Sequence, residues 1–403
     1  MMFYTYSMPD NLNEKLSIGL ADDDEIIAIL SGCFPCGSGN TQSVEYQNDE
    51  QECAVKLAYK DGVITEAVRG PALTEEKLSE IVGKIESAIL TEGAQKISRS
   101  FLFSYEKVDG FWKYRDLFQI MPAPAEAPDP TESYAQHPFV LEISYKGSSD
   151  WRVGQVRTFR KQYEIRLLLH LFLNGNVVWE DWQTKKKWVF VGQDADLHSE
   201  WSQLGYTVPN FQAATEEFSD TGTSQPLTGV EANDYFSRHG ITTNPLEIPA
   251  SLTALFDAFY NLSREDREQF LRACFWYYTA GSAWEVTPSL HYNCLITAIE
   301  TLMGRAEAQP CEHCGKDTSP GPTGKFKTFL QTYAPESHNA RDRDRFYALR
   351  STLSHGGRLF RQDLPRTFGA LHPTEIEEWS SGGDVSKLTR VGLINWLSSR
   401  ETE

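Results

Sequence analysis

The sequence has no apolar stretch long enough to cross a bilayer. Its longest apolar cluster, from Ile165 to Leu173, is too short and is interrupted by Arg166 and His170. The first residues, MMFYTYSMPD, also lack the basic region and the apolar core of a secretory signal peptide. We therefore expect a soluble, cytoplasmic protein without a membrane partner.

Basic residues are scarce overall and are concentrated in one stretch. The 403 residues contain 38 Lys and Arg against 56 Asp and Glu, and the formal net charge of −18 argues against a general nucleic-acid coat protein. Between residues 325 and 366, however, nine basic residues stand against four acidic ones, a net charge of +5. An anionic ligand would be attracted to this stretch. The alternative is a solvated helix face, because the signs of charge alternate in RDRDR at 341–345.

Cysteines are few and odd in number, which argues against a framework of disulfide bonds. The seven thiols occur in a long chain without a secretory signal. Cys311 and Cys314 have the spacing of metal ligands. A structural zinc site needs four ligands, so His313, His338 or another cysteine would have to complete it.

The first half of the chain predicts an α+β region rich in antiparallel strands, in one or two subdomains over residues 1–192. The apolar run Ile26–Leu30 predicts a short strand. Ser100–Val108 and Trp112–Met121 predict a hairpin around Asp109-Gly110. Val156–Leu173 predicts a helix that ends at Asn174-Gly175. We assign a sensing or recruiting role to this region, with a protein or phage component as its trigger.

The second half predicts helices only. Residues 193–248 form a linker-rich segment that includes the turn-forming run SDTGTSQPLTG. Helical periodicity then returns and continues over residues 249–403, with a helix beginning at Pro288 and another over Arg341–Leu353. The predicted fold class is α+β, with an antiparallel-sheet region followed by an all-α bundle.

One motif in the bundle carries chemistry. FYALRSTLSHGGRLFRQD at 346–363 contains Arg350, four intervening residues and His355, at the end of an amphipathic helix. The upstream segment HYNCLITAIETLMG at 291–304 carries Glu300 and Leu302. Together with the Cys-x2-Cys loop and GPTGKFKTFL, these residues resemble the HEPN superfamily and are similar to the C-terminal domain of ApeA-type phage-defence proteins. The resemblance covers roughly residues 250–370.

The resemblance implies a metal-independent endoribonuclease that acts as a phage-defence or toxin-like effector. His355 would be the acid/base for the ribose 2′-OH, since His exchanges protons near neutral pH. Arg350 would clamp the phosphate, with Ser351 and Glu300 in support. Catalysis would require no cofactor, and two protomers would pair through this domain. The residues expected to bind RNA are Lys325, Lys327, Arg345, Arg358 and Arg361.

A structural role for the motif is the competing hypothesis. Ser351 stands where active HEPN members commonly carry Asn, Asp or His. Arg350 would then pair with Glu300 across the helix packing, and His355 would cap a helix C-terminus, where an imidazolium meets the negative end of the dipole. In that case the bundle would be a non-catalytic dimerisation or nucleotide-binding module with a partner-binding N-terminal region.

Overall fold

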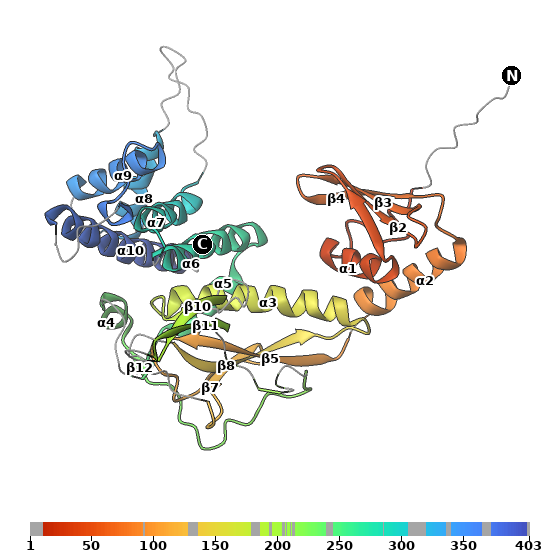
Figure 1. Ribbon diagram of the computed structural model, residues 1–403, viewed down its shortest axis with the longest axis horizontal. Coiled ribbons are helices and arrows are strands. Elements are labelled where there is room, and N and C mark those ends of the chain that lie inside the picture. Colours follow the sequence, from red (N-terminus) through yellow and green to blue (C-terminus); the bar gives the residue numbers. More distant parts are fainter. Residues whose placement is uncertain are drawn as a thin grey trace, which may run out of the picture.

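The structure is a computed structural model with three parts along the chain: an N-terminal module, a central sheet covered by one long helix, and a helical domain (Figure 1). Among the described residues, no helix is both long and apolar enough to span a membrane. The residues that the structure describes are 11–91, 93–127, 136–178, 186–192, 196–203, 206, 208–209, 211, 214–238, 245–284, 286–304, 320–335, 340–364 and 372–400.

The N-terminal module is a four-stranded antiparallel sheet with two helices and its own hydrophobic core. The strand predicted at Ile26–Leu30 is wrong, because these residues lie in helix α1. The Asp22 side chain starts this helix by accepting hydrogen bonds from the backbone N–H groups of Asp24 and Glu25. The elements are α1 (Asp23–Cys33), β1 (Cys36–Gly39), β2 (Ser43–Gln47), β3 (Cys53–Lys60), β4 (Val63–Arg69), α2 (Glu75–Ile85) and the π-helical turn η1 (Glu86–Leu90).

The central sheet has the strand order β6-β7-β8-β5-β9 and is antiparallel throughout. The predicted hairpin around Asp109-Gly110 is wrong, because β5 pairs with β8 instead. Gly110 serves a close backbone approach, since a Cβ there would lie 2.6 Å from the carbonyl oxygen of Gln225. The strands are β5 (Gln95–Ser104), β6 (Trp112–Tyr114), β7 (Phe118–Pro122), β8 (His137–Lys146) and β9 (Val177–Val178).

Helix α3 (Trp151–Phe172) lies along the sheet, with one end beside the N-terminal module and α5 and α6 near its other end (Figure 1). It ends as predicted, with Asn174 and Gly175 in the left-handed region at φ of 56° and 78°. Near its start, Arg157 makes a bidentate ion pair with Glu25 of α1, at 2.8 and 2.6 Å. The helix therefore joins the module to the rest of the protein.

The C-terminal region is helical, and the predicted α+β class is confirmed. Smaller elements precede it, namely β10 (Lys186–Val191), β11 (His198–Gln203), β12 (Gly229–Val230), α4 (Ala232–Ser237) and β13 (Ile248–Pro249). Its helices are α5 (Leu252–Asn261), α6 (Arg264–Trp284), α7 (Pro288–Leu302), α8 (Pro322–Tyr333), α9 (Ala340–Ser354), the 3-10 turn η3 (Arg361–Asp363) and α10 (Pro373–Ser399).

One hydrophobic core joins the central sheet, α3 and the helical domain. Phe256 of α5 illustrates the junction, with ring centroids 4.9 Å from Phe118 of β7 and 5.2 Å from Phe172 of α3. Tyr114 also donates a hydrogen bond of 2.5 Å to Asp257. The predicted division into residues 1–192, 193–248 and 249–403 stays a prediction.

Candidate functional site

The candidate site lies where α9 crosses α7. Helix α7 is buried over most of its surface, but Asn293, Thr297 and Glu300 are half-buried. Their spacings of four and three residues place these side chains on one face of the helix. The intervening residues are buried. This half-buried stripe of α7 is therefore polar, and its Asn293 and Glu300 contact Ser354 and Arg350 of α9.

Arg350 and Glu300 meet across this crossing. One Arg350 terminal nitrogen (Nη2) lies 2.7 Å from Glu300 Oε2, and the two side chains are 25% and 19% exposed. The second carboxylate oxygen of Glu300 accepts a 2.8 Å hydrogen bond from the Tyr347 hydroxyl. Burial and the adjacent Glu300 carboxylate raise the pKa of Tyr347 to about 12, so this hydroxyl remains a donor at neutral pH.

His355 comes directly after α9 ends. The N–H of Gly357 donates to the Thr352 carbonyl at 2.9 Å, the N–H of Gly356 donates to the Leu353 carbonyl at 3.3 Å, and Gly356 has a φ of +72°. This is a Schellman motif, in which glycine supplies the left-handed residue. The His355 side chain is exposed, and no hydrogen bond or ion pair ties its imidazole to another described residue.

The segment after His355 is fixed to the start of α7. The N–H of Phe360 donates to the Ser289 hydroxyl at 2.8 Å, and Asp363 accepts from the backbone N–H of Ser289 at 3.0 Å. The Phe360 side chain is buried, and its ring centroid lies 5.5 Å from that of Tyr292. The backbone of His355 is thus held between the end of α9 and an anchored loop.

Two other residues of the motif face different directions. Ser351 is half-buried and lies about 100° around α9 from Arg350, so its side chain does not share the Arg350 face. Ser354 instead donates a hydrogen bond of 3.0 Å to Asn293.

The sequence did not predict that Asn293 and Tyr347 would belong to the site. The signal for Tyr347 was its position three residues before Arg350, on the same helix face.

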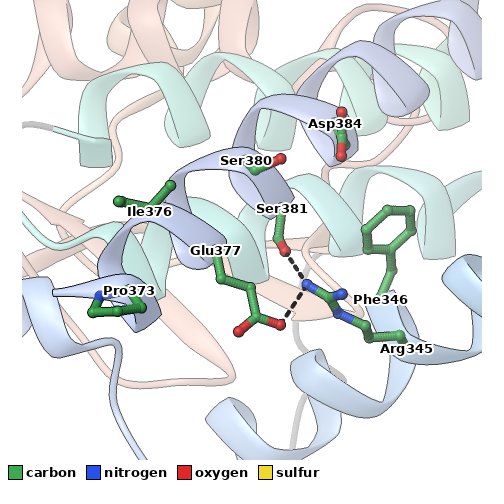
Figure 2. Close-up of a pocket in the computed structure, with 8 residues that line it drawn as sticks. All are labelled: Arg345, Phe346, Pro373, Ile376, Glu377, Ser380, Ser381 and Asp384. Atoms are coloured by element: carbon green, nitrogen blue, oxygen red, sulfur yellow. Dashed lines mark hydrogen bonds and ion pairs between the residues drawn. The ribbon is translucent and has the colours of Figure 1, made fainter.

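The basic residues expected to bind RNA are not gathered around Arg350. Figure 2 shows Arg345 directed at Glu377 and Ser381 of α10, at 2.9 and 3.0 Å, in a pocket between α9 and α10. The others lie apart. Lys325 donates to the Gly304 carbonyl, Lys327 pairs with Asp344, Arg361 lies 3.7 Å from Glu375, and Arg358 is exposed. Nearby acids therefore offset much of the positive charge in this stretch.

The proposed zinc ligands Cys311 and Cys314, with His313 and His338, lie outside the described residues. The cysteines that are described, Cys33, Cys36, Cys53, Cys274 and Cys294, are free thiols. In the described ranges no three His, Cys, Asp or Glu side chains are grouped as metal ligands. The zinc site accordingly stays a prediction.

Comparison with known proteins gives no further assignment. No protein-family model matches the chain, and neither a curated protein nor a solved structure matches it. The resemblance to HEPN domains therefore stays a prediction from the sequence.

Proposed function

We propose that the protein is a metal-independent endoribonuclease of the HEPN type, used as a phage-defence or toxin-like effector. The exposure of His355 on a fixed backbone supports this role best. The structural histidines of the chain look different. His170 is buried, with Nδ1 2.5 Å from the Val177 carbonyl, and His291 is buried with Nδ1 2.8 Å from the Ala280 carbonyl. Burial lowers the pKa of both, to about 4 for His170.

The chemistry proposed for His355 and Arg350 follows from the properties of their side chains. His355 takes the proton from a ribose 2′-OH, whose oxygen attacks the adjacent phosphorus. The P–O5′ bond breaks, and the protonated His355 returns the proton to the departing 5′-oxygen. Arg350 stabilises the charge that builds on the phosphate oxygens, because its guanidinium is planar and permanently charged. The products are a 2′,3′-cyclic phosphate and a 5′-hydroxyl.

This reaction predicts cleavage without metal ions. We expect the purified full-length protein to cut single-stranded RNA in excess EDTA and to leave 2′,3′-cyclic phosphate ends. Gel electrophoresis and mass spectrometry of the fragments measure both. Cleavage that stops in EDTA and returns with Mg²⁺ would contradict the mechanism. Intact RNA under all conditions would instead favour the non-catalytic alternative.

We also propose that the protein forms a homodimer through one apolar end of the helical domain. The loop that contains Phe360 and Asp363 is hydrogen-bonded to Ser289 at the start of α7. Trp379 of α10 donates a hydrogen bond to Gln362 of the same loop. Gly382 of α10 lies under the ring of Trp284 at the end of α6. The end adjoins the candidate site, because Leu290 lies one turn before Asn293. The exposed apolar side chains of this end are Trp284, Val286, Leu290, Leu359, Leu364, Ile376 and Trp379.

Substituting Trp379→Glu should convert the dimer to a monomer, because a charge would replace an aromatic ring in the contact. Sedimentation velocity measures the change. Trp151→Glu is the matched control, since Trp151 is an exposed tryptophan on α3, outside the apolar end. A wild-type protein that sediments as a monomer would rule out this dimer, as would an unchanged dimer in the Trp379 variant.

The non-catalytic module is the second candidate, and one observation favours it. Arg350 already has a carboxylate partner, and most of the residues expected to bind RNA have partners of their own. In this reading His355 keeps only a structural place at the C-terminus of α9, where its backbone N–H donates to the Ser351 carbonyl at 3.1 Å. The EDTA experiment separates the two functions.

A further inference from the structure

We propose that Glu300 is an internal inhibitor of the anion site formed by Arg350. In the structure its carboxylate is bonded to the guanidinium that would bind a phosphate, so the site is closed. This inference concerns the regulation of the proposed nuclease site and rests on that function. The sequence led us to expect that Glu300 helps Arg350 to hold the phosphate. The present inference is the opposite, because removing the charge of Glu300 should strengthen substrate binding.

The geometry of the contact supports displacement by phosphate. A carboxylate and a phosphate bind a guanidinium through the same type of charge-assisted hydrogen bond. Glu300 reaches Arg350 through one terminal nitrogen, at 2.7 Å. Glu300 therefore contacts only one of the two terminal nitrogens of a partly exposed guanidinium, and a phosphate with several free oxygens can engage both.

The position of Glu300 within α7 is unfavourable without Arg350. Glu300 lies in the last turn of a helix that ends at Leu302 and has no basic residue in that turn. A negative charge at a helix C-terminus meets the negative end of the helix dipole. Arg350 and the Tyr347 hydroxyl offset this cost. When a phosphate binds Arg350, Glu300 loses the ion pair that stabilises its carboxylate in this position.

Partial exposure makes the exchange feasible. The Arg350 and Glu300 side chains are 25% and 19% exposed, whereas those of the structural pair Arg157 and Glu25 are 12% and 9% exposed. A displaced Glu300 carboxylate can turn to water, so its charge is not left buried. A phosphodiester and a carboxylate both carry a negative charge and repel each other on one guanidinium, so phosphate binding favours this displacement.

The experiment measures binding of a short fluorescein-labelled 2′-O-methyl RNA, which cannot be cleaved because it lacks the attacking hydroxyl. Full-length wild type is compared with Glu300→Gln, which keeps the size and the hydrogen-bonding capacity of the side chain. The matched control is Glu268→Gln, which removes the partner of Arg264 on α6, an arginine outside the set expected to bind RNA. We expect Glu300→Gln to lower the dissociation constant about ten-fold, because a nearby like charge is removed, and Glu268→Gln to have little effect.

The double variant Glu300→Gln/Arg350→Ala tests whether the tighter RNA binding depends on Arg350. We expect the increase in affinity to disappear in this variant. Unchanged or weaker binding by Glu300→Gln, or a gain that survives loss of Arg350, would overturn the inference. Cleavage of ordinary RNA is assayed in parallel. If Glu300→Gln tightens binding but no variant cleaves RNA, the proposed nuclease fails while the inhibitory contact stands. If wild type cleaves RNA and Glu300→Gln binds no better, only the inhibitory contact fails.

Discussion

Replacing His355 with alanine should lower RNA cleavage by the full-length protein at least about a hundred-fold, the usual scale for losing a general acid–base group. The fold should be unaffected, because the imidazole is exposed and the end of α9 is closed by backbone hydrogen bonds from Gly356 and Gly357. Cleavage rates measured with excess enzyme, together with thermal unfolding, test both statements.

His198→Ala is the matched control for this prediction. His198 is an exposed histidine on β11, and its Nε2 lies 3.0 Å from Glu200. Its loss should leave cleavage unchanged. Full activity in His355→Ala would show that this imidazole takes no part in the reaction. A similar loss in both variants would point to a general effect of losing a surface histidine.

Arg157→Ala should destabilise the attachment of the N-terminal module by about 3–5 kcal/mol, the cost of leaving a buried charge without its partner. Arg157 and Glu25 are nearly buried, and Arg157 also donates to the Gly147 carbonyl at 3.0 Å. Its removal would leave the Glu25 carboxylate enclosed without a cation. Urea unfolding measures the change in free energy, and limited proteolysis reports release of residues 1–91.

Arg160→Ala provides the comparison on the same helix. Arg160 pairs with Asp22 and Asp24 at 2.6 and 2.7 Å, but its side chain is 49% exposed. Water screens such pairs, so its loss should cost no more than about 1 kcal/mol. Equal destabilisation by the two substitutions would mean that burial does not decide the strength of this contact.

Local signals made part of the fold predictable. The end of α3 at Asn174-Gly175 follows from residues that tolerate a left-handed backbone, and the start of α7 follows from proline at its first position. Ile26–Leu30 was misassigned because a short apolar run suits a strand or a buried helix equally. The partner of β5 could not be predicted, since β8 is separated from it by two other strands.

The site shows the same division between local and distant contacts. The helix carrying Arg350 and the glycine turn after His355 could be predicted from neighbouring residues, and the Arg350–Glu300 contact was foreseen as the structural alternative. The roles of Tyr347 and Asn293 depend on how α9 crosses α7, and helical periodicity alone does not give that crossing.

The shared core has a consequence for how the protein can be divided. Cutting the chain at residue 249 would strip Phe256 of its contacts with Tyr114, Phe118 and Phe172 and would expose the sheet-facing side of α5 to water. The helical domain and the central sheet should therefore melt together as a single cooperative unit. Among the described residues, the N-terminal module packs around a separate core, to which α3 contributes Val153, so this module is the part that can unfold separately from the rest.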